Sequence, residues 1–211
     1  MKKITIMLAL LSTIALVACK SEAPIETPAT DDQATPETTS TTIEGFTFTM
    51  PTEYTPLTKV PEDTSIVGVY ATYEFANPKT LSTPVPDSIY FYSTESIEKG
   101  ETECKESQKL QEEGFWPCTH LPNVEDYKYQ KQVLMEGKDY NKDTILQNFN
   151  GRNYLVSGYK CSGDSCTMRT YSTFIDDTKI EIVVGMWGDE TGDLTKDIAA
   201  ADKILAKFSI E

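Results

Sequence analysis

The residues that most often carry catalysis are sparse in this sequence and do not fall into a recognisable spacing. The single histidine, His120, follows Cys118 by two residues in a loop flanked by prolines, so any Cys-His or Ser-His-Asp arrangement would have to use it. A structural histidine is the default interpretation in such a loop. The sequence also lacks a Gly-x-Ser-x-Gly turn, a phosphate-binding glycine loop and a dinucleotide fingerprint. We therefore predict no catalytic residue and no cofactor.

Carboxylates are the remaining source of acid–base chemistry. The chain has 33 Asp and Glu residues, but a pair suited to glycoside hydrolysis leaves no sequence pattern, so no pair is named. An envelope hydrolase that uses Asp or Glu on glycan substrates stays an alternative. The acidic segment 189–193 lacks the twelve-residue helix–loop–helix calcium pattern, and we interpret it as a helix-capping turn.

Four cysteines besides Cys19 could form disulfides. They are Cys104, Cys118, Cys161 and Cys166. An even number in an exported chain predicts two disulfides, and three connectivities are possible. We favour Cys161–Cys166 across a hairpin tip and Cys104–Cys118 between a helix and the loop after it. Free thiols and a zinc site are the other interpretations, but these spacings suit a zinc knuckle poorly and we predict no metal.

The two tryptophans could bind a ligand by stacking. Trp116 and Trp187 offer aromatic faces of the kind that hold sugars or cations. Trp187 falls on the outward alternation of its predicted strand, where it could instead lie beneath a helix. We favour packing for both.

The first residues have the composition of an export signal. A positive start is followed by an apolar stretch over 4–17 and by a small residue before Cys19. The ending Leu16-Val17-Ala18-Cys19 resembles the lipobox of bacterial lipoproteins. The resemblance implies a signal peptide over 1–18, cleavage before Cys19, and a diacylglycerol on its thiol, often with a further acyl chain such as palmitate. Two or three acyl chains hold a protein stably at a membrane.

The resemblance also implies where the protein is found. It would be lipid-anchored and face away from the cytoplasm. In a source with two membranes we expect the outer membrane, because Lys20 is not the Asp that favours inner-membrane retention. In a source with one membrane we expect the outer face of the cytoplasmic membrane.

Residues 19–42 are predicted to be a disordered tether. Thr, Pro, Glu, Ala and Asp dominate, and Ile25 is the one large aliphatic residue, so the segment cannot bury enough surface to offset its ordering entropy.

The formal net charge of the chain is −14. Such acidity argues against nucleic acid as a partner and against direct binding to anionic headgroups.

From residue 43 onward the hydrophobic period changes to two. Strands are predicted over 43–51, 67–75, 89–92 and 129–135, and a helix over 101–113. Asn150-Gly151 predicts a hairpin between 145–149 and 153–159, and later turns at 161–166 and 176–178 complete a four-stranded meander. An amphipathic helix over 194–208 needs a sheet face to cover. We expect one α+β domain over 43–211, with a largely antiparallel sheet of about six to eight strands and packed helices.

The two ends of this domain suggest a family. The opening Gly45-Phe46-Thr47-Phe48-Thr49-Met50-Pro51 and the closing Ile204-Leu205-Ala206-Lys207-Phe208-Ser209-Ile210 resemble the ends of the Mog1/PsbP-like α/β/α sandwich. Members of that family mostly act as small binding or assembly factors. The resemblance implies no site residues here. We predict a non-catalytic binding or assembly module of the cell envelope, which has an envelope protein or a small ligand as its partner, and a purely structural coat protein is a third possibility.

Overall fold

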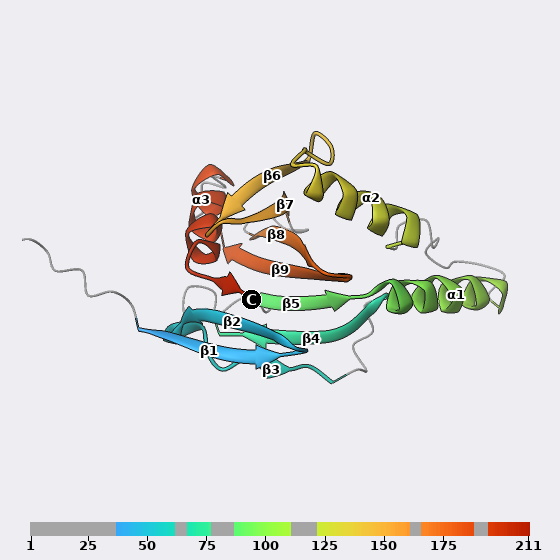
Figure 1. Ribbon diagram of the computed structural model, residues 1–211, viewed down its shortest axis with the longest axis horizontal. Helices are drawn as coiled ribbons and strands as arrows, with labels where there is room; N and C mark the ends of the chain where they lie inside the picture. The colour runs from blue at the N-terminus through green and yellow to red at the C-terminus, as the bar shows by residue number, and fades with distance from the viewer. Residues whose placement is uncertain (1–36, 62–66, 77–86, 111–121, 161–165, 188–193) are drawn as a thin grey trace, which may run out of the picture. The chain divides into compact units, whose positions relative to one another are not determined.

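The second half of the chain forms the antiparallel meander that its turns predict. The computed structural model describes residues 37–61, 67–76, 87–110, 122–160, 166–187 and 194–211 (Figure 1). The meander contains β6 (Thr144–Phe149), β7 (Arg152–Lys160), β8 (Cys166–Ile175) and β9 (Thr178–Trp187). Asn150 and Gly151 have φ angles of 51° and 81°, as a two-residue hairpin turn requires. The hairpin prediction is confirmed.

The meander is one half of a seven-stranded sheet with the order β3-β4-β5-β9-β8-β7-β6. The other half contains β3 (Thr58–Lys59), β4 (Val69–Phe75) and β5 (Asp87–Tyr92). Each neighbouring pair is antiparallel, including β5 and β9, which are far apart in the sequence. This confirms the predicted α+β class with a largely antiparallel sheet.

A second sheet corrects the predicted end of the tether. The segment Thr38–Ile43 is strand β1, which pairs with β2 (Phe46–Pro51), and β10 (Ser209–Ile210) pairs with the other edge of β2. Composition suggested disorder up to residue 42, but threonine favours strands. Hydroxyls bond across the ladder, with Ser40 to Thr49 at 2.7 Å. The folded part therefore begins before residue 43.

Three α-helices and a short 3-10 helix complete the described elements. They are η1 (Thr52–Tyr54), α1 (Thr94–Leu110), α2 (Val124–Met135) and α3 (Leu194–Leu205). The strand predicted over 129–135 is wrong, because these residues are the last part of α2. The Asn123 side chain caps this helix by accepting a hydrogen bond from the Asp126 backbone N–H at 2.8 Å, a helix-start signal that the strand prediction did not include.

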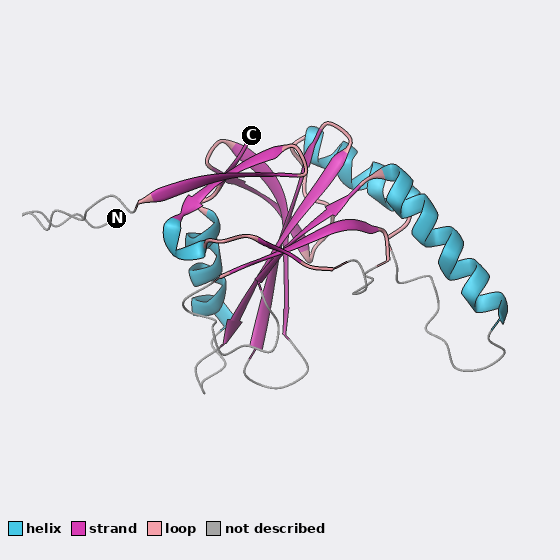
Figure 2. Ribbon diagram, turned by 90° about the horizontal axis from the view of Figure 1, so that it is seen from below, coloured by secondary structure: helices cyan, strands magenta, loops and turns pink. Residues whose placement is uncertain are grey.

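The helices cover both faces of the large sheet (Figure 2). On one face, Ile180, Ile182 and Val184 of β9 share the main core with α3 and the small sheet. On the other face, α2 packs Tyr127 against the aromatic side of β5 and Leu134 against β7. Pro36–Glu211 is one compact unit. Within the described ranges, no helix has both the length and the apolar character needed to cross a membrane.

Candidate functional site

The large sheet divides at the end where two of its hairpins turn. The ladder between β7 and β8 ends at the pair Leu155–Ser172, although β7 begins at Arg152 and β8 continues to Ile175. The two hairpin tips separate beyond that pair, and a cavity of about 810 Å³ opens between them. We call it the split-end pocket. Its lining comes from α2, both hairpin tips and the C-terminal segment: Lys131, Leu134, Met135, Phe149–Tyr154, Thr173, Phe174, Asp176 and Phe208–Glu211.

Helix α2 holds one tip in place. Lys131 Nζ lies 2.6 Å from Asp177 Oδ1, and the Tyr127 hydroxyl donates a hydrogen bond to the Asp177 carbonyl. The hydrogen bond and charge of Lys131 lower the pKa of Asp177. The Tyr127 ring also meets Phe174 edge-on at 5.1 Å between centroids. The β8–β9 tip is therefore fixed to α2.

The C-terminal segment holds the other tip. Asn150 Nδ2 donates to the carbonyl oxygens of Ala206 at 2.8 Å and Phe208 at 2.6 Å. Arg152 Nη2 donates to the Ile210 carbonyl at 2.8 Å. Asn150 has positive φ, which asparagine tolerates better than most residues. The pocket thus has two walls, each anchored separately.

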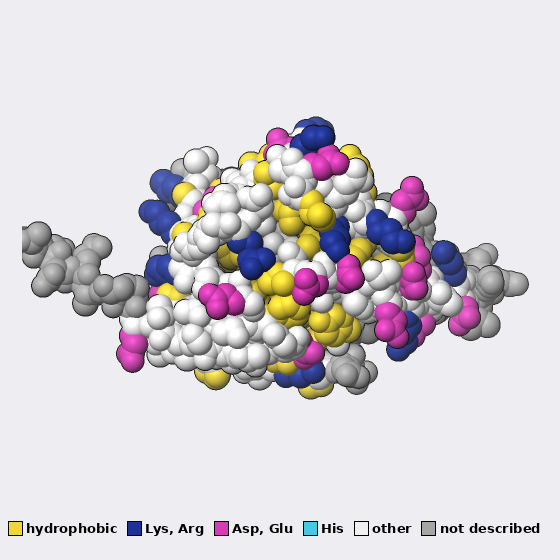
Figure 3. All heavy atoms as spheres, viewed as in Figure 1, with side chains coloured by type: hydrophobic (Ala, Val, Ile, Leu, Met, Phe, Trp, Pro, Cys, Tyr) yellow, Lys and Arg dark blue, Asp and Glu magenta, His cyan; other side chains and the backbone are white. Residues whose placement is uncertain are grey.

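Aromatic side chains supply much of the apolar lining. Phe149 lies 6.0 Å from the Tyr154 ring, with the rings near perpendicular, and Phe208 is almost fully buried. Met135 is 77% exposed at the rim. The face seen in Figure 3 shows hydrophobic side chains at its centre, with basic and acidic side chains around them. The lining therefore combines aromatic and aliphatic surface with many polar side chains, and a concave site of this kind can contact both an apolar and a polar part of a small molecule.

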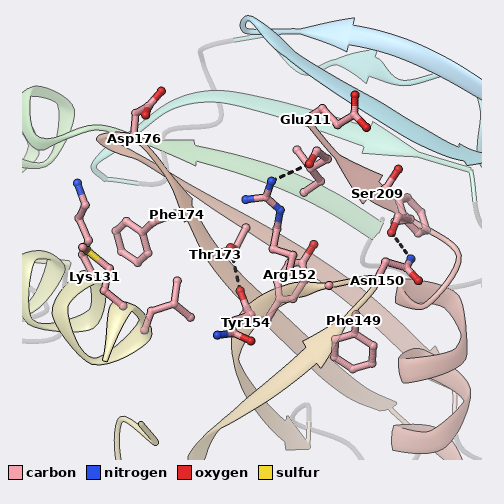
Figure 4. A pocket seen from close by; sticks show the side chains of 16 residues that line it. Lys131, Phe149, Asn150, Arg152, Tyr154, Thr173, Phe174, Asp176, Ser209 and Glu211 are labelled. Atoms are coloured by element: carbon pink, nitrogen blue, oxygen red, sulfur yellow. Dashed lines mark hydrogen bonds between the residues drawn. The ribbon is translucent and has the colours of Figure 1, made fainter. Parts of the chain in front are cut away.

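Arg152 and Tyr154 are two polar residues of the pocket lining. They are two residues apart on β7 and so share one face of the strand, and they lie between Asn150 and Asp176 in Figure 4. Among the described residues, no carboxylate lies within ion-pair distance of Arg152. In contrast, the other arginine of the chain, Arg169, pairs with Asp202 at 3.2 Å.

The Tyr154 hydroxyl is buried without a hydrogen-bond partner. The residue is 1% exposed, and within the described part of the chain its hydroxyl makes no hydrogen bond. Burial raises the pKa of Tyr154 to about 12, although the nearby Arg152 charge works in the opposite direction. The hydroxyl is therefore protonated at neutral pH and available as a donor.

Together the two side chains can donate hydrogen bonds to a negatively charged or polar group. The pocket could take a group of this kind on a molecule whose apolar part contacts the aromatic walls. In the described ranges, no group of three or more His, Cys, Asp or Glu residues is placed to hold a metal ion.

A second polar cluster lies on the α2 side of the sheet. Lys179 Nζ is 2.9 Å from Glu181 Oε2, and the Ser172 hydroxyl donates to the same oxygen at 3.0 Å. The ammonium also lies 5.0 Å from the centre of the Tyr92 ring. Burial works to raise the pKa of Glu181, but these partners outweigh it and hold the pKa below its ordinary value. Each charge has a partner inside the cluster, so we assign it to the packing of β5, β8 and β9.

Of the residues singled out from the sequence, Cys104 is described with its side chain, and it does not line the pocket. Cys104 is buried on α1 and is not a free thiol. Cys166 begins β8 opposite Trp187, and both side chains lie outside the described residues. The same is true of Cys19, Cys118, Cys161, His120 and Trp116. The acylation and both disulfide pairings stay predictions.

The pocket itself was missed from the sequence. The Asn150-Gly151 turn located one of its walls, but nothing in the pattern showed that β7 and β8 separate. One signal was present: the chain has only two arginines, and Arg152 directly follows that turn.

Comparisons with known proteins identify no family for this chain. No family model and no curated protein matches it, so the Mog1/PsbP-like resemblance stays a prediction. Among solved structures, a Bacteroides thetaiotaomicron protein aligns at 13% identity and a TM-score of 0.37, over 79% of this chain and 45% of that one. LpqN of Mycobacterium tuberculosis, described as involved in cell envelope biogenesis, aligns at 15% identity and a TM-score of 0.30, over 82% and 90%. This chain spans less than half of the Bacteroides protein. Both TM-scores are too low to establish a shared fold or to indicate a function.

Proposed function

We propose that this chain is a bacterial envelope lipoprotein, anchored by acyl chains on Cys19, whose folded domain binds a small ligand in the split-end pocket without catalysis. The Leu16-Val17-Ala18-Cys19 junction after an apolar stretch carries the anchoring half. The pocket, whose lining combines aromatic surface with the donors of Arg152 and Tyr154, supports the binding half.

Acylation is tested by metabolic labelling. The full-length chain and its Cys19→Ser variant are expressed in a bacterium that processes lipoproteins, in the presence of an azide-tagged palmitate. We expect label on the wild type, none on the variant, and membrane fractionation of the wild type alone. Absence of label from the wild type, or equal membrane retention of the variant, would contradict the anchoring half.

Ligand binding is tested by photocrosslinking in the producing cell. A photoreactive amino acid replaces Met135 at the pocket rim, and the control replaces Lys142, whose side chain is 89% exposed and does not line the pocket. We expect a defined mass adduct at position 135 and none at 142. Equal adducts at both positions would contradict binding in the pocket.

The competing function is a carboxylate-dependent hydrolase of envelope glycans. It is tested by incubating the purified full-length protein with cell-wall glycan and measuring the release of reducing ends. Under our proposal no release above buffer is expected. Release that disappears when the pocket is blocked would instead support the hydrolase.

A further inference from the structure

We infer that the split-end pocket recognises an anionic group on a small, otherwise apolar molecule, and that Arg152 and Tyr154 donate the hydrogen bonds that hold this group. The inference rests on the proposed ligand-binding function and names the chemical class of its ligand.

The first observation is the state of Arg152. In a chain with 33 acidic and 19 basic residues, a partly buried guanidinium would be expected to attract a carboxylate. Among the described residues none lies within 4.0 Å of it, and its one hydrogen bond goes to the Ile210 carbonyl. A guanidinium has five N–H donors. The remaining donors and the full positive charge stay available to a ligand.

The second observation is the Tyr154 hydroxyl. Natural proteins rarely leave a buried hydroxyl without a hydrogen bond, because its desolvation is unfavourable. Phenylalanine would fill the same space without that cost. A hydroxyl kept on the same strand face as an unpaired guanidinium is explained by a ligand group that accepts hydrogen bonds from both.

The acidic residues of the pocket do not oppose this assignment. Asp176 and Glu211 are exposed at its edge, and their side chains point away from Arg152 in Figure 4. Charges in contact with water are screened by salt. The positive charge of Lys131 is already paired with Asp177, so Arg152 is the cation of the described pocket lining that has no ion pair.

The apolar lining defines the rest of the ligand. Phe149, Phe174 and Leu134 present aromatic and aliphatic surface to the pocket. An ion without an apolar body, such as inorganic phosphate, would leave this surface unused. We therefore expect the ligand to join one anionic group to an aromatic or aliphatic body.

The test uses two probes of the same shape, 4-phenylbutyrate and its uncharged amide. Their affinities for the full-length chain in dodecyl maltoside are measured by isothermal titration calorimetry. Wild type is expected to bind the carboxylate about tenfold more tightly than the amide, since hydrogen bonds to charged groups are the stronger ones. Inorganic phosphate is expected to bind more weakly than the carboxylate.

The variants separate the two donors from general damage. Tyr154→Phe should weaken binding of the carboxylate about fivefold and binding of the amide by less, because a hydrogen bond to a charged acceptor is the stronger one. Arg152→Gln keeps a donor for the Ile210 carbonyl and should abolish the preference for the carboxylate. The control Tyr171→Phe changes a buried tyrosine of the neighbouring strand that does not line the pocket, and both affinities should stay as in wild type.

The outcomes distinguish the two proposals. Equal binding of carboxylate and amide to wild type would overturn the inference and leave ligand binding in the pocket standing. Phosphate binding as tight as that of the carboxylate would contradict the apolar body. If neither organic probe bound the wild type, both the inference and the ligand-binding half of the proposed function would be contradicted.

Discussion

Two buried tyrosines on neighbouring strands should respond to the loss of their hydroxyls with opposite signs. Tyr171 is 0% exposed and Tyr154 is 1% exposed, so both side chains are buried to the same extent. The two hydroxyls differ in their hydrogen-bond partners. The Tyr171 hydroxyl donates to Asp202 Oδ1 at 2.7 Å, whereas the Tyr154 hydroxyl makes no hydrogen bond in the described part of the chain.

The magnitudes follow from that difference. A hydrogen bond to a charged group contributes about 1.5–3 kcal/mol, so Tyr171→Phe should lower the free energy of unfolding by roughly that amount. An unsatisfied buried hydroxyl costs about 1–3 kcal/mol in mutational data, so Tyr154→Phe should raise it by up to about 1 kcal/mol once the small lost volume is counted. For a domain of this size, 1 kcal/mol corresponds to a shift in Tm of about 2–4 °C.

The assay is urea unfolding of the full-length chain, followed by tryptophan fluorescence, with a thermal melt as a second measurement. The expected order of stability is Tyr154→Phe, then wild type, then Tyr171→Phe, with similar m-values for all three. A loss of 1 kcal/mol or more in Tyr154→Phe would show that its hydroxyl is hydrogen-bonded in the free protein. In that case the reasoning about an unsatisfied donor in the pocket would fail.

Three further predictions concern the framework. The folded-state pKa of Glu181 is lowered, so its contribution to stability should be present above pH ~4.5 and lost as the pH falls through that lowered pKa. Glu181→Gln should therefore make the free energy of unfolding depend less on pH between pH 2 and 6. An unchanged pH dependence would contradict this. Asn150→Gly keeps the positive φ but removes two hydrogen bonds, so the free energy of unfolding measured in urea should fall by about 1–2 kcal/mol. Wild-type stability would mean that these bonds do not hold the β6–β7 tip to the C-terminal segment. If Cys104 and Cys118 are paired, Cys118→Ser should lower the free energy of unfolding by about 3 kcal/mol. Alkylation without reduction should then add one more label to the variant than to the wild type by intact mass, and equal labelling would contradict the pairing.

The sequence was informative where a local signal determined the structure. The Asn150-Gly151 turn predicts the β6–β7 hairpin because few residue pairs tolerate two successive positive φ angles. The period-two pattern of β9 and the spacing of Ala201 and Leu205 on α3 correctly identify the faces that meet in the main core. These features depend on residues close together in the chain.

It failed once because a local signal was overlooked: the Asn123 side chain caps α2, so residues 129–135 are helical. The other failures came where a tertiary contact decided the outcome. The Thr-rich segment of β1 has no core-forming composition, and it is ordered because β2 provides a partner for each residue. The pocket depends on where the β7–β8 ladder stops, which no local pattern encodes.

The order of the small sheet links the N-terminal strand of the folded domain to the pocket. The tether enters the domain at β1, β1 is hydrogen-bonded to β2, and β2 is hydrogen-bonded to β10, whose Ile210 carbonyl holds Arg152. A pull exerted by an anchored N-terminus would thus travel across two ladders to the residue that we assign to ligand recognition. If the chain is anchored and binds a ligand as we propose, we expect tension on the tether to alter how firmly the pocket retains that ligand.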